Sequence, residues 1–394
     1  MLVLLIVSSA LLIGCGDSAS SLEPDSGPYA DTGTSADTGT EIETGTEIDT
    51  GTDTQSAQDT GDTGVVSAPA FEMHLVDVGS GLAVVAAGDD FVMVVDGGSD
   101  DDADDGENNR LIAYLKAIRP ALTHIDQLVL THPHHDHMSL LPALFEHYAV
   151  DEVWDSGTPS PLSDYHAILT AVEASGAVYH SPIDDAGTHV IALNSPDDSY
   201  PEAVTLSHGA RISAGMSVPL GEGAEMTFLF ANETPDMDDF NLNSMVVRVD
   251  LAERRILLMG DAHGGPSAQT AEPPSPGSIE AQLLETPDAI DVDVLQVGDH
   301  GFPESNHRAF LDEVSPSISL IASYPVFSPP VQDVLDALSV YGPIFRTDAD
   351  DDACRANSSK VGTGADGLPG GCDNILVTFA PDGTFTTEYF VPED

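Results

Sequence analysis

A cluster of metal-binding side chains constrains this sequence most strongly. Residues 132–137 read His132-Pro133-His134-His135-Asp136-His137 and directly follow the apolar run Ile125–Thr131. Imidazole and carboxylate groups together suit zinc, and they also bind manganese or iron. His132 and His134 would point the same way from an extended segment, whereas Asp136 and His137 would lie where the chain turns into a helix. One short loop could therefore hold two metal ions; the alternative is a histidine-rich surface loop without metal.

Five further segments accompany this cluster along the chain. They read HLVDVGSG at 74–81, VVDGG at 94–98, NSMV at 243–246, LMGDA at 258–262 and VLQVGDHG at 294–301. Together the motifs resemble the metallo-β-lactamase superfamily, and their ordered set is similar to the hydrolase domain of the ComEC competence-protein group. The resemblance covers roughly residues 71–394. It implies an α/β fold, built as a four-layer αββα sandwich, and a metal-dependent hydrolase.

The resemblance also implies a ligand set for two divalent metal ions. Zinc is the expected metal, and manganese is the alternative. Asp261 ends an apolar strand and would bridge both ions. His300 resembles the last metal-binding histidine of the family. One ion would then be held by His132, His134 and Asp261, and the other by Asp136, His137, Asp261 and His300.

Two positions depart from the family pattern. ComEC-like domains usually have two histidines before the last glycine, whereas this chain has Asp299 and His300. We expect His300 to be the ligand, with Asp299 as the alternative. Many superfamily members also contribute a histidine between the first motif and the bridging aspartate. The histidines of that interval have no convincing context: His166, His180, His189 and His208. His263 could fill the gap or donate a proton, or it could be a plain loop histidine.

Asp77 and Asp96 both end apolar runs at turns that contain glycine. Turn chemistry alone explains aspartate at such positions. In a metal site, however, a carboxylate that accepts the spare N–H of an imidazole ligand orients that ligand. On the resemblance, Asp96 is the better candidate of the two for this role.

The ligand set predicts the chemistry. Two neighbouring divalent ions lower the pKa of a bridging water toward ~7, so that the bound hydroxide can attack phosphorus or a carbonyl carbon. Asp136, His137 and Asp261 would form the catalytic centre, and no Gly-x-Ser-x-Gly nucleophile motif is visible in the sequence. The resemblance favours phosphodiester bonds as the substrate. Carboxylic or lactone-type esters are the alternative, and a non-catalytic binding or sensing module that keeps the fold is a third hypothesis.

The first fifteen residues carry no charge and are almost wholly apolar. This segment is shorter than the ~20 residues of a membrane span and is typical of a signal-peptide core. Leu12-Ile13-Gly14-Cys15 resembles the bacterial lipobox, in which Cys15 becomes the lipid-carrying N-terminus. No Lys or Arg precedes the apolar run, so the true start could lie upstream. We expect an exported bacterial lipoprotein, anchored in a membrane through this lipid on the periplasmic or cell-surface side.

Residues 16–70 have a different composition, with twelve acidic residues, no basic residue and repeated Asp-Thr-Gly-Thr units. Such a tract cannot bury enough apolar surface to fold, so we expect a disordered tether. A coil of this length has a root-mean-square span of ~40 Å, and charge repulsion extends it further. The tether would hold the domain away from the membrane surface.

The remaining 71–394 segment is itself strongly acidic. Of the 67 acidic residues in the chain twelve belong to the tether, which leaves 55 against 11 basic residues and a net charge near −44. This charge should repel polyanions. We therefore expect a small-molecule or short phosphodiester or ester substrate and no duplex nucleic acid.

Cys354 and Cys372 flank a stretch that is rich in glycine and serine. In an exported protein they could pair as a disulfide, which would contribute ~3 kcal/mol by closing a loop of that size. Two free thiols are the alternative.

Hydrophobic patterning predicts alternating strands and helices from residue 72 onward. The expected strands before the metal loop are 72–77, 82–87, 91–96 and 127–131, with a helix at 108–118, and a helix over 138–147 follows the loop. The second half is expected to repeat strands and then helices, and to end in a hairpin, 374–379 with 384–390, around Pro381-Asp382-Gly383.

Overall fold

The structure is a computed structural model that describes residues 70–100, 109–194, 199–265, 270–324, 329–348 and 373–390. All of these residues belong to one compact unit, Gly64–Asp394. The expected signal sequence with Cys15, nearly all of the tether, and the pair Cys354 and Cys372 lie outside the described residues. Within the described part of the chain, the structure contains no helix with the length and hydropathy needed to cross a bilayer.

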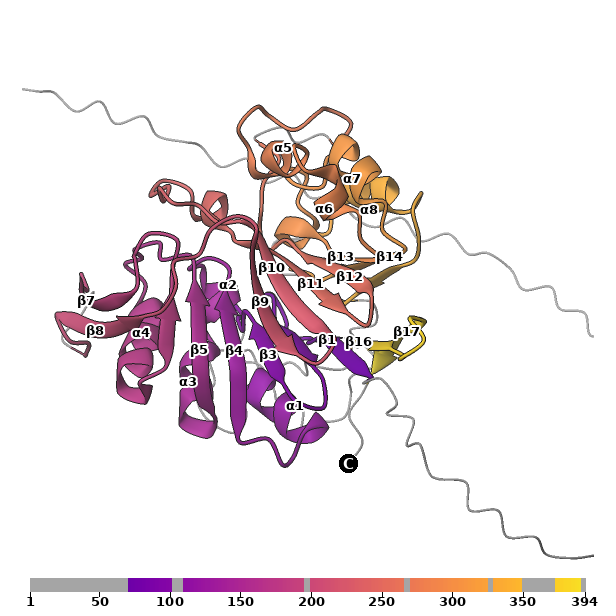
Figure 1. Ribbon diagram of the computed structural model, residues 1–394. Helices are drawn as coiled ribbons and strands as arrows, with labels where there is room; N and C mark the ends of the chain where they lie inside the picture. Colours follow the sequence, from indigo (N-terminus) through magenta and orange to yellow (C-terminus); the bar gives the residue numbers. More distant parts are fainter. Residues whose placement is uncertain are drawn as a thin grey trace, which may run out of the picture. The chain divides into compact units, whose positions relative to one another are not determined.

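The first of two β-sheets combines the N-terminal half of the domain with the C-terminal hairpin (Figure 1). Its strand order is β17-β16-β1-β2-β3-β4-β5-β6-β8-β7. These strands span, in chain order, β1 Phe71–Leu75, β2 Val84–Ala87, β3 Val92–Val95, β4 His124–Leu130, β5 Ala149–Asp155, β6 Val178–His180, β7 Gly187–Ala192, β8 Ala203–His208, β16 Asn374–Phe379 and β17 Phe385–Phe390. The neighbours β3, β4 and β5 run parallel, so their carboxyl ends meet at one edge.

The second sheet has the strand order β15-β14-β13-β12-β11-β10-β9. Its strands are β9 Met216–Gly221, β10 Ala224–Phe230, β11 Val246–Leu251, β12 Arg254–Leu258, β13 Val294–Gln296, β14 Ile318–Ile321 and β15 Ile344–Arg346. From β12 to β15 the pairing is parallel, which gives this sheet a common carboxyl edge as well.

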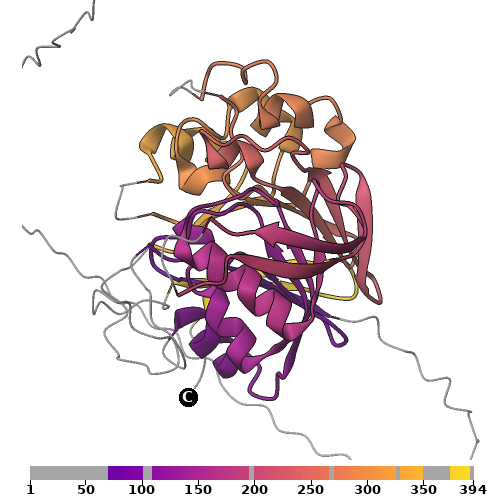
Figure 2. The same ribbon diagram turned by 90° about the vertical axis from the view of Figure 1, so that its left-hand side faces the viewer.

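Helices cover the outer face of each sheet. The first sheet is covered by α1 (Arg110–Ile118), α3 (Leu141–His147) and α4 (Ser163–Ser175). The second is covered by α5 (Ile279–Leu283), α6 (Pro287–Ile290), α7 (Arg308–Val314) and α8 (Gln332–Leu338). Figure 2 shows the two helical layers on opposite sides of the strands. The predicted α/β class and four-layer sandwich are confirmed.

Side chains alternate across the strands and so supply three apolar clusters. In β12, Ile256 and Leu258 point into the core between the two sheets, whereas Leu257 packs beneath the helices of the second sheet. In β4, Val129 faces the core between the sheets and Leu128 faces the helices of the first sheet. Both faces of these strands are buried only in their carboxyl-terminal halves, and there the sequences are continuously apolar: Leu128–Leu130 in β4 and Ile256–Leu258 in β12.

The structure differs from the sequence-based expectation in two regions. The helix predicted over 138–147 is split into α2 (His135–Met138) and α3. Pro142, in the first turn of α3, has no backbone N–H to donate to the carbonyl of Met138, so one continuous helix is disfavoured. Strands β6 to β9 were not predicted, and they lie between residues 178 and 221. In β7 every residue is exposed or only half-buried, so the apolar signal is weak.

Candidate metal centre

Residues 132–137, which we call the metal loop, follow β4 after Thr131. Close backbone contacts hold this loop against the turns that contain Leu82 and Gly97. Leu82 N donates to Asp136 O at 2.9 Å, and Gly97 N donates to His137 O at 2.8 Å. A Cβ atom on Gly98 would lie 1.9 Å from the carbonyl carbon of Asp136. Only glycine permits this approach, which explains why the 94–98 motif accompanies the histidine cluster.

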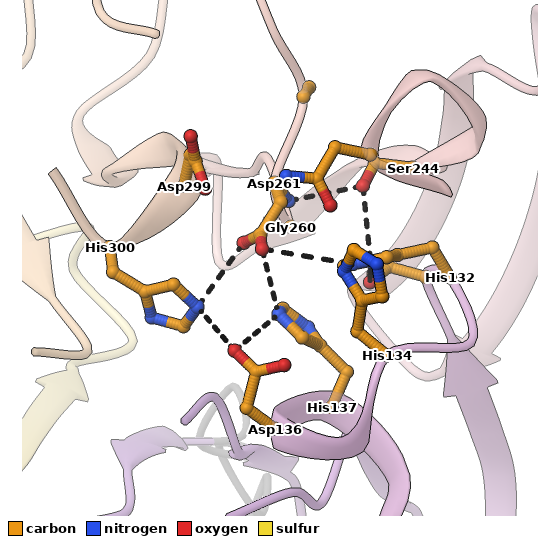
Figure 3. Close-up of polar contacts among 12 residues, drawn as sticks. His132, His134, Asp136, His137, Ser244, Gly260, Asp261, Asp299 and His300 are labelled. Atoms are coloured by element: carbon orange, nitrogen blue, oxygen red, sulfur yellow. Dashed lines mark hydrogen bonds and ion pairs between the residues drawn. The ribbon is translucent and has the colours of Figure 1, made fainter. Parts of the chain in front are cut away.

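Asp136, His137, Asp261 and His300 come together at the carboxyl ends of β4, β12 and β13 (Figure 3). Each of the four offers one ligand atom, and these atoms lie within 4.8 Å of one another. His300 Nε2 is 3.0 Å from Asp136 Oδ2 and 3.5 Å from Asp261 Oδ1. His137 Nε2 is 3.1 Å from Asp261 Oδ2. We call this set the first ligand group.

His132, His134 and Asp261 form a second ligand group, again with ligand atoms within 4.8 Å of one another. His132 Nε2 lies 2.9 Å from His134 Nδ1 and 3.7 Å from Asp261 Oδ2. The Asp261 carboxylate therefore belongs to both groups, and it stands between the His132 and His300 imidazoles in Figure 3. The structure brings together the same two sets that the sequence predicted; their role as ligands stays a prediction.

Three imidazoles are oriented by contacts that engage Nδ1 and leave Nε2 for the centre. His137 Nδ1 donates to Asp96 Oδ2 at 2.7 Å, and His300 Nδ1 donates to Ala322 O at 2.8 Å. His132 Nδ1 lies 3.1 Å from Ser244 Oγ. A histidine that donates from one nitrogen offers a lone pair at the other, which is the form that binds metal.

Unusual backbone geometry places His300. Asp299, His300 and Gly301 all have positive φ, at 49°, 51° and 86°. L-residues adopt this region at an energetic cost, so the surrounding contacts must hold it. Asp299 N donates to Gly260 O at 3.0 Å, and Phe302 N donates to Asp299 O at 2.7 Å. The resulting tight turn directs the His300 ring toward Asp261.

The electrostatics of the first ligand group favour a cation. Although burial acts to lower the pKa of His137, the neighbouring carboxylates of Asp261 and Asp136 raise it well above its ordinary value. Burial also opposes protonation of His300, but Asp261 and Asp136 raise its pKa in the same way. Burial would raise the pKa of Asp261, yet these two imidazoles hold it well below the usual range. The buried carboxylates of Asp136 and Asp261 are thus stabilised by positive charge next to them.

The donor set fits divalent metal ions. Three buried atoms of the first group form close polar contacts only with other members of that group and have no hydrogen-bond partner elsewhere among the described residues: Nε2 of His137, Nε2 of His300 and Oδ1 of Asp261. Buried polar atoms are almost always satisfied. Two imidazole nitrogens and carboxylate oxygens at this spacing are the ligands that zinc and manganese take, so bound ions would satisfy them.

The two departures noted in the sequence have distinct structural outcomes. His300, and not Asp299, belongs to the first ligand group. Asp299 Oδ2 instead lies 3.1 Å from His263 Nε2, and Asn241 Nδ2 is at 3.1 Å from the same nitrogen. Burial raises the pKa of Asp299 to about 6. Neither group includes the histidines of the interval before Asp261, which are His166, His180, His189 and His208.

Asp96 and Asp77 differ in their contacts. Asp96 accepts from His137 Nδ1 and also from the backbone N and Oγ1 of Thr131, at 2.8 and 2.7 Å. Asp77 accepts from the backbone N–H of Gly79 at 3.1 Å, which is the turn chemistry that the sequence left open. The structure thus brings Asp96 to an imidazole of the centre.

Sequence reasoning missed the part played by Ser244. Its Oγ lies near His132 Nδ1 and also accepts from Asp261 N at 3.1 Å (Figure 3). One hydroxyl therefore connects His132 with Asp261, the residue that both ligand groups share. The signal was present in the 243–246 motif, but the motif alone does not reveal the contact.

A cavity of about 300 Å³ opens over the centre, and we call it the metal cavity. Its described lining consists of Asp100, His134, His135, Asp136, Leu162, Asn241, Asp261, Asp299, His300, Phe302 and Tyr324. The Tyr324 ring stacks on His300 with ring centroids 5.0 Å apart. No lysine or arginine belongs to this described lining, so its carboxylates face no positively charged side chain other than a protonated histidine.

Known proteins similar to this chain share little of its sequence. Among solved structures the chain is similar to the metallo-beta-lactamase fold protein YhfI from Bacillus subtilis, with 12% identity, a TM-score of 0.39, and coverage of 70% of this chain and 96% of that chain. An archaeal superfamily protein from Sulfolobus tokodaii shows 18% identity and a TM-score of 0.32, with 68% and 96% covered. The subclass B3 metallo-beta-lactamase MEM-A1 from a soil metagenome shows 12% identity and a TM-score of 0.33, with 70% of this chain and 95% of that chain covered.

At these scores the structural likenesses carry no argument about function. None of the curated proteins matches the sequence significantly. The family profile of the metallo-beta-lactamase superfamily, however, matches residues 76–323, a range that contains every residue of both ligand groups. The chain therefore belongs to the metallo-beta-lactamase superfamily.

Proposed function

We propose that the protein is a metal-dependent hydrolase that uses two divalent ions of one kind, with zinc as the leading candidate and manganese as the alternative. The observation that carries the proposal is the position of Asp261, whose carboxylate belongs to both ligand groups. The first ion would be held by Asp136, His137, Asp261 and His300, and the second by His132, His134 and Asp261. Membership of a superfamily that consists generally of metal-dependent hydrolases supports this proposal.

Divalent ions bound there would polarise a scissile phosphoryl or carbonyl group and lower the pKa of water. The protein's own residues hold the centre rigid. Asp96 fixes the His137 ring, Ser244 Oγ lies against His132, and the Ala322 carbonyl fixes His300. Because Asp136, His137 and Asp261 are all buried, they bind and orient with little loss of side-chain freedom when ions arrive.

The proposed substrate is a small phosphodiester. The resemblance to the ComEC hydrolase domain supports the phosphodiester class, and the absence of lysine and arginine from the described lining supports the small size. Each phosphate outside the centre would meet a strongly acidic surface, with a net charge near −44 over residues 71–394. The second candidate is a carboxylic or lactone-type ester, which has no charge to be repelled.

A third possibility is a binding or sensing module without turnover. Hydrolysis by the full chain, stripped of metal and reloaded with zinc or manganese, decides between them. We expect turnover of bis(p-nitrophenyl) phosphate or p-nitrophenyl acetate that disappears in Asp261→Asn. Asp185→Asn changes an exposed carboxylate outside both groups and should keep the activity. Metal-loaded protein that hydrolyses neither substrate would contradict the hydrolase proposal and favour the binding module.

We also propose that Cys15 carries lipid and that residues 16–70 tether the domain to a membrane on the periplasmic or cell-surface side. The support is the match of Leu12-Ile13-Gly14-Cys15 to a bacterial lipobox after an uncharged apolar segment. The acidic tether would then place the metal cavity within reach of soluble substrates.

A further inference from the structure

A second cavity, of about 370 Å³, lies beside the metal cavity and is mainly apolar in its lining. We call it the apolar cavity. Its walls come from the β5–α4 loop, α4, the strands β6 and β7, and the segment before Asn241. The apolar lining residues include Pro159, Pro161, Leu169, Ile191, Leu193 and Met237. The volume is roughly twelve times that of a water molecule in the liquid, enough for a medium-length chain or one ring.

Two tyrosine hydroxyls of this wall are bonded to a residue outside the lining. The hydroxyls of Tyr165 and Tyr179 both donate to Asp155 Oδ2, which is buried. This leaves the two rings to line the cavity. Met237, at the edge of the lining, is 55% exposed. An apolar ligand would cover this surface.

One buried polar atom in the wall is unpartnered. His166 is 1% exposed and lines the cavity, and its Nε2 donates to Ser160 O at 3.0 Å. Nδ1 must then be an acceptor, and it has no hydrogen-bond partner among the described residues. Unsatisfied buried acceptors are uncommon. A ligand with one N–H or O–H group would satisfy it.

The two cavities share a wall. Pro161 lines the apolar cavity and Leu162, the next residue, lines the metal cavity; neighbouring Cα atoms are about 3.8 Å apart. Met237 lines the apolar cavity, and Asn241, four residues later, lines the metal cavity. His135, from the metal loop, contacts Asp164 at the start of α4 with Nδ1 2.6 Å from Oδ2. In Figure 1 α4, β7 and β8 lie together on one side, next to α2.

We infer that the apolar cavity binds an uncharged, apolar substituent of the molecule whose scissile bond lies in the metal cavity. The substrate class is thus a small ester or diester that carries a medium-length aliphatic chain or a single aromatic ring. This inference rests on the proposed hydrolase function and adds to it the part of the substrate that is not cleaved.

Two matched substrate series test the inference in the metal-loaded full chain. One is p-nitrophenyl acetate, butyrate and hexanoate; the other is ethyl, butyl and hexyl p-nitrophenyl phosphodiesters. In whichever series is hydrolysed, we expect kcat/KM to rise about fourfold for each added methylene until the cavity is filled. Polyanionic substrates without an apolar chain should gain nothing from this cavity.

Substitutions at the rim of the apolar cavity test whether this cavity causes the rise in kcat/KM with chain length. Ala192 is exposed and belongs to the lining, so Ala192→Trp should occupy the space and flatten the chain-length profile. Met237→Asp, at a second exposed position, should have the same effect through its charge. Val190→Trp is the matched control, because Val190 lies on the same strand, is 71% exposed and does not belong to the lining.

Binding of octanamide to the metal-stripped chain, measured by calorimetry, separates this inference from the proposed function. Wild type and Val190→Trp should bind it, whereas Ala192→Trp and Met237→Asp should not. A flat chain-length profile or absence of octanamide binding would overturn the inference, even if hydrolysis is observed. Octanamide binding without turnover of either series would overturn the proposed hydrolysis of these substrates and still support an apolar ligand in this cavity.

Discussion

Asp96 Oδ2 lies 2.7 Å from His137 Nδ1, and both side chains are fully buried. This contact fixes the ring so that Nε2 faces Asp261. Asp96→Asn replaces a charged acceptor by a neutral amide, and we expect the metal affinity of the first ligand group to fall about 10–100-fold. Titration of the metal-stripped protein against a chromogenic chelator measures this loss.

Asp77→Asn is the matched comparison for that variant. Asp77 accepts from the backbone N–H of Gly79, and asparagine keeps an oxygen acceptor for this bond. We expect its metal affinity to stay near that of the wild type. Equal losses in the Asp77 and Asp96 variants would show that the orienting role assigned to Asp96 is wrong.

Gly98→Ala should destabilise the protein by about 3 kcal/mol, the upper range for overpacking a rigid site. The added Cβ would lie 1.9 Å from a backbone carbon of Asp136, so the metal loop would have to move. Gly176→Ala meets no atom within 4 Å but has a φ of 75°, and it should cost only about 1 kcal/mol. Urea unfolding of both variants checks the difference; equal costs would refute the contact argument.

The strands that position the centre could be read from the sequence because they are buried on both faces. The last three residues of β4 and of β12 are apolar and polar residues follow them, so the carboxyl edge could be located. The pairing of β16 with β1, from opposite ends of the domain, left no local signal. The edge strand β7 was missed because none of its residues is fully buried.

In the site too, some features could be predicted from the sequence and others could not. His132 and His134 could be predicted from their spacing in an extended segment, and Asp261 and His300 from motif resemblance. Ser244 contacts His132 across more than a hundred residues of sequence and also Asp261. A contact over such a sequence distance cannot be predicted from hydrophobic periodicity. The apolar cavity depends on β7 and on the β5–α4 loop, and that part of the chain was the least regular in sequence.

Cys15→Ala should release the protein from membranes in soluble form. Stable anchoring needs more than one acyl chain, since each buried CH₂ contributes only ~0.8 kcal/mol, and the lipobox modification would supply them. Partitioning between detergent and aqueous phases in the bacterial host measures the change. Unchanged partitioning of the variant would exclude lipidation at this residue.

Salt should affect small and large phosphodiesters differently. Hydrolysis of bis(p-nitrophenyl) phosphate should change little with ionic strength, because the substrate has one charge to repel. Any cleavage of long DNA should instead rise with salt, which screens repulsion by the acidic domain. Filter binding and cleavage assays over a salt series check this. Tight duplex binding at low salt that weakens as salt increases would contradict it.

Metal content tests the central claim most directly. Elemental analysis of the full chain, reloaded with zinc or manganese and freed of excess ions, should give close to two ions per chain, one for each ligand group. His300→Ala should lose mainly one ion, and Asp299→Ala should keep both. Asp261→Ala should lose both together, because its carboxylate belongs to each group. Less than half an equivalent in the wild type, or two ions retained in Asp261→Ala, would contradict the shared-carboxylate centre.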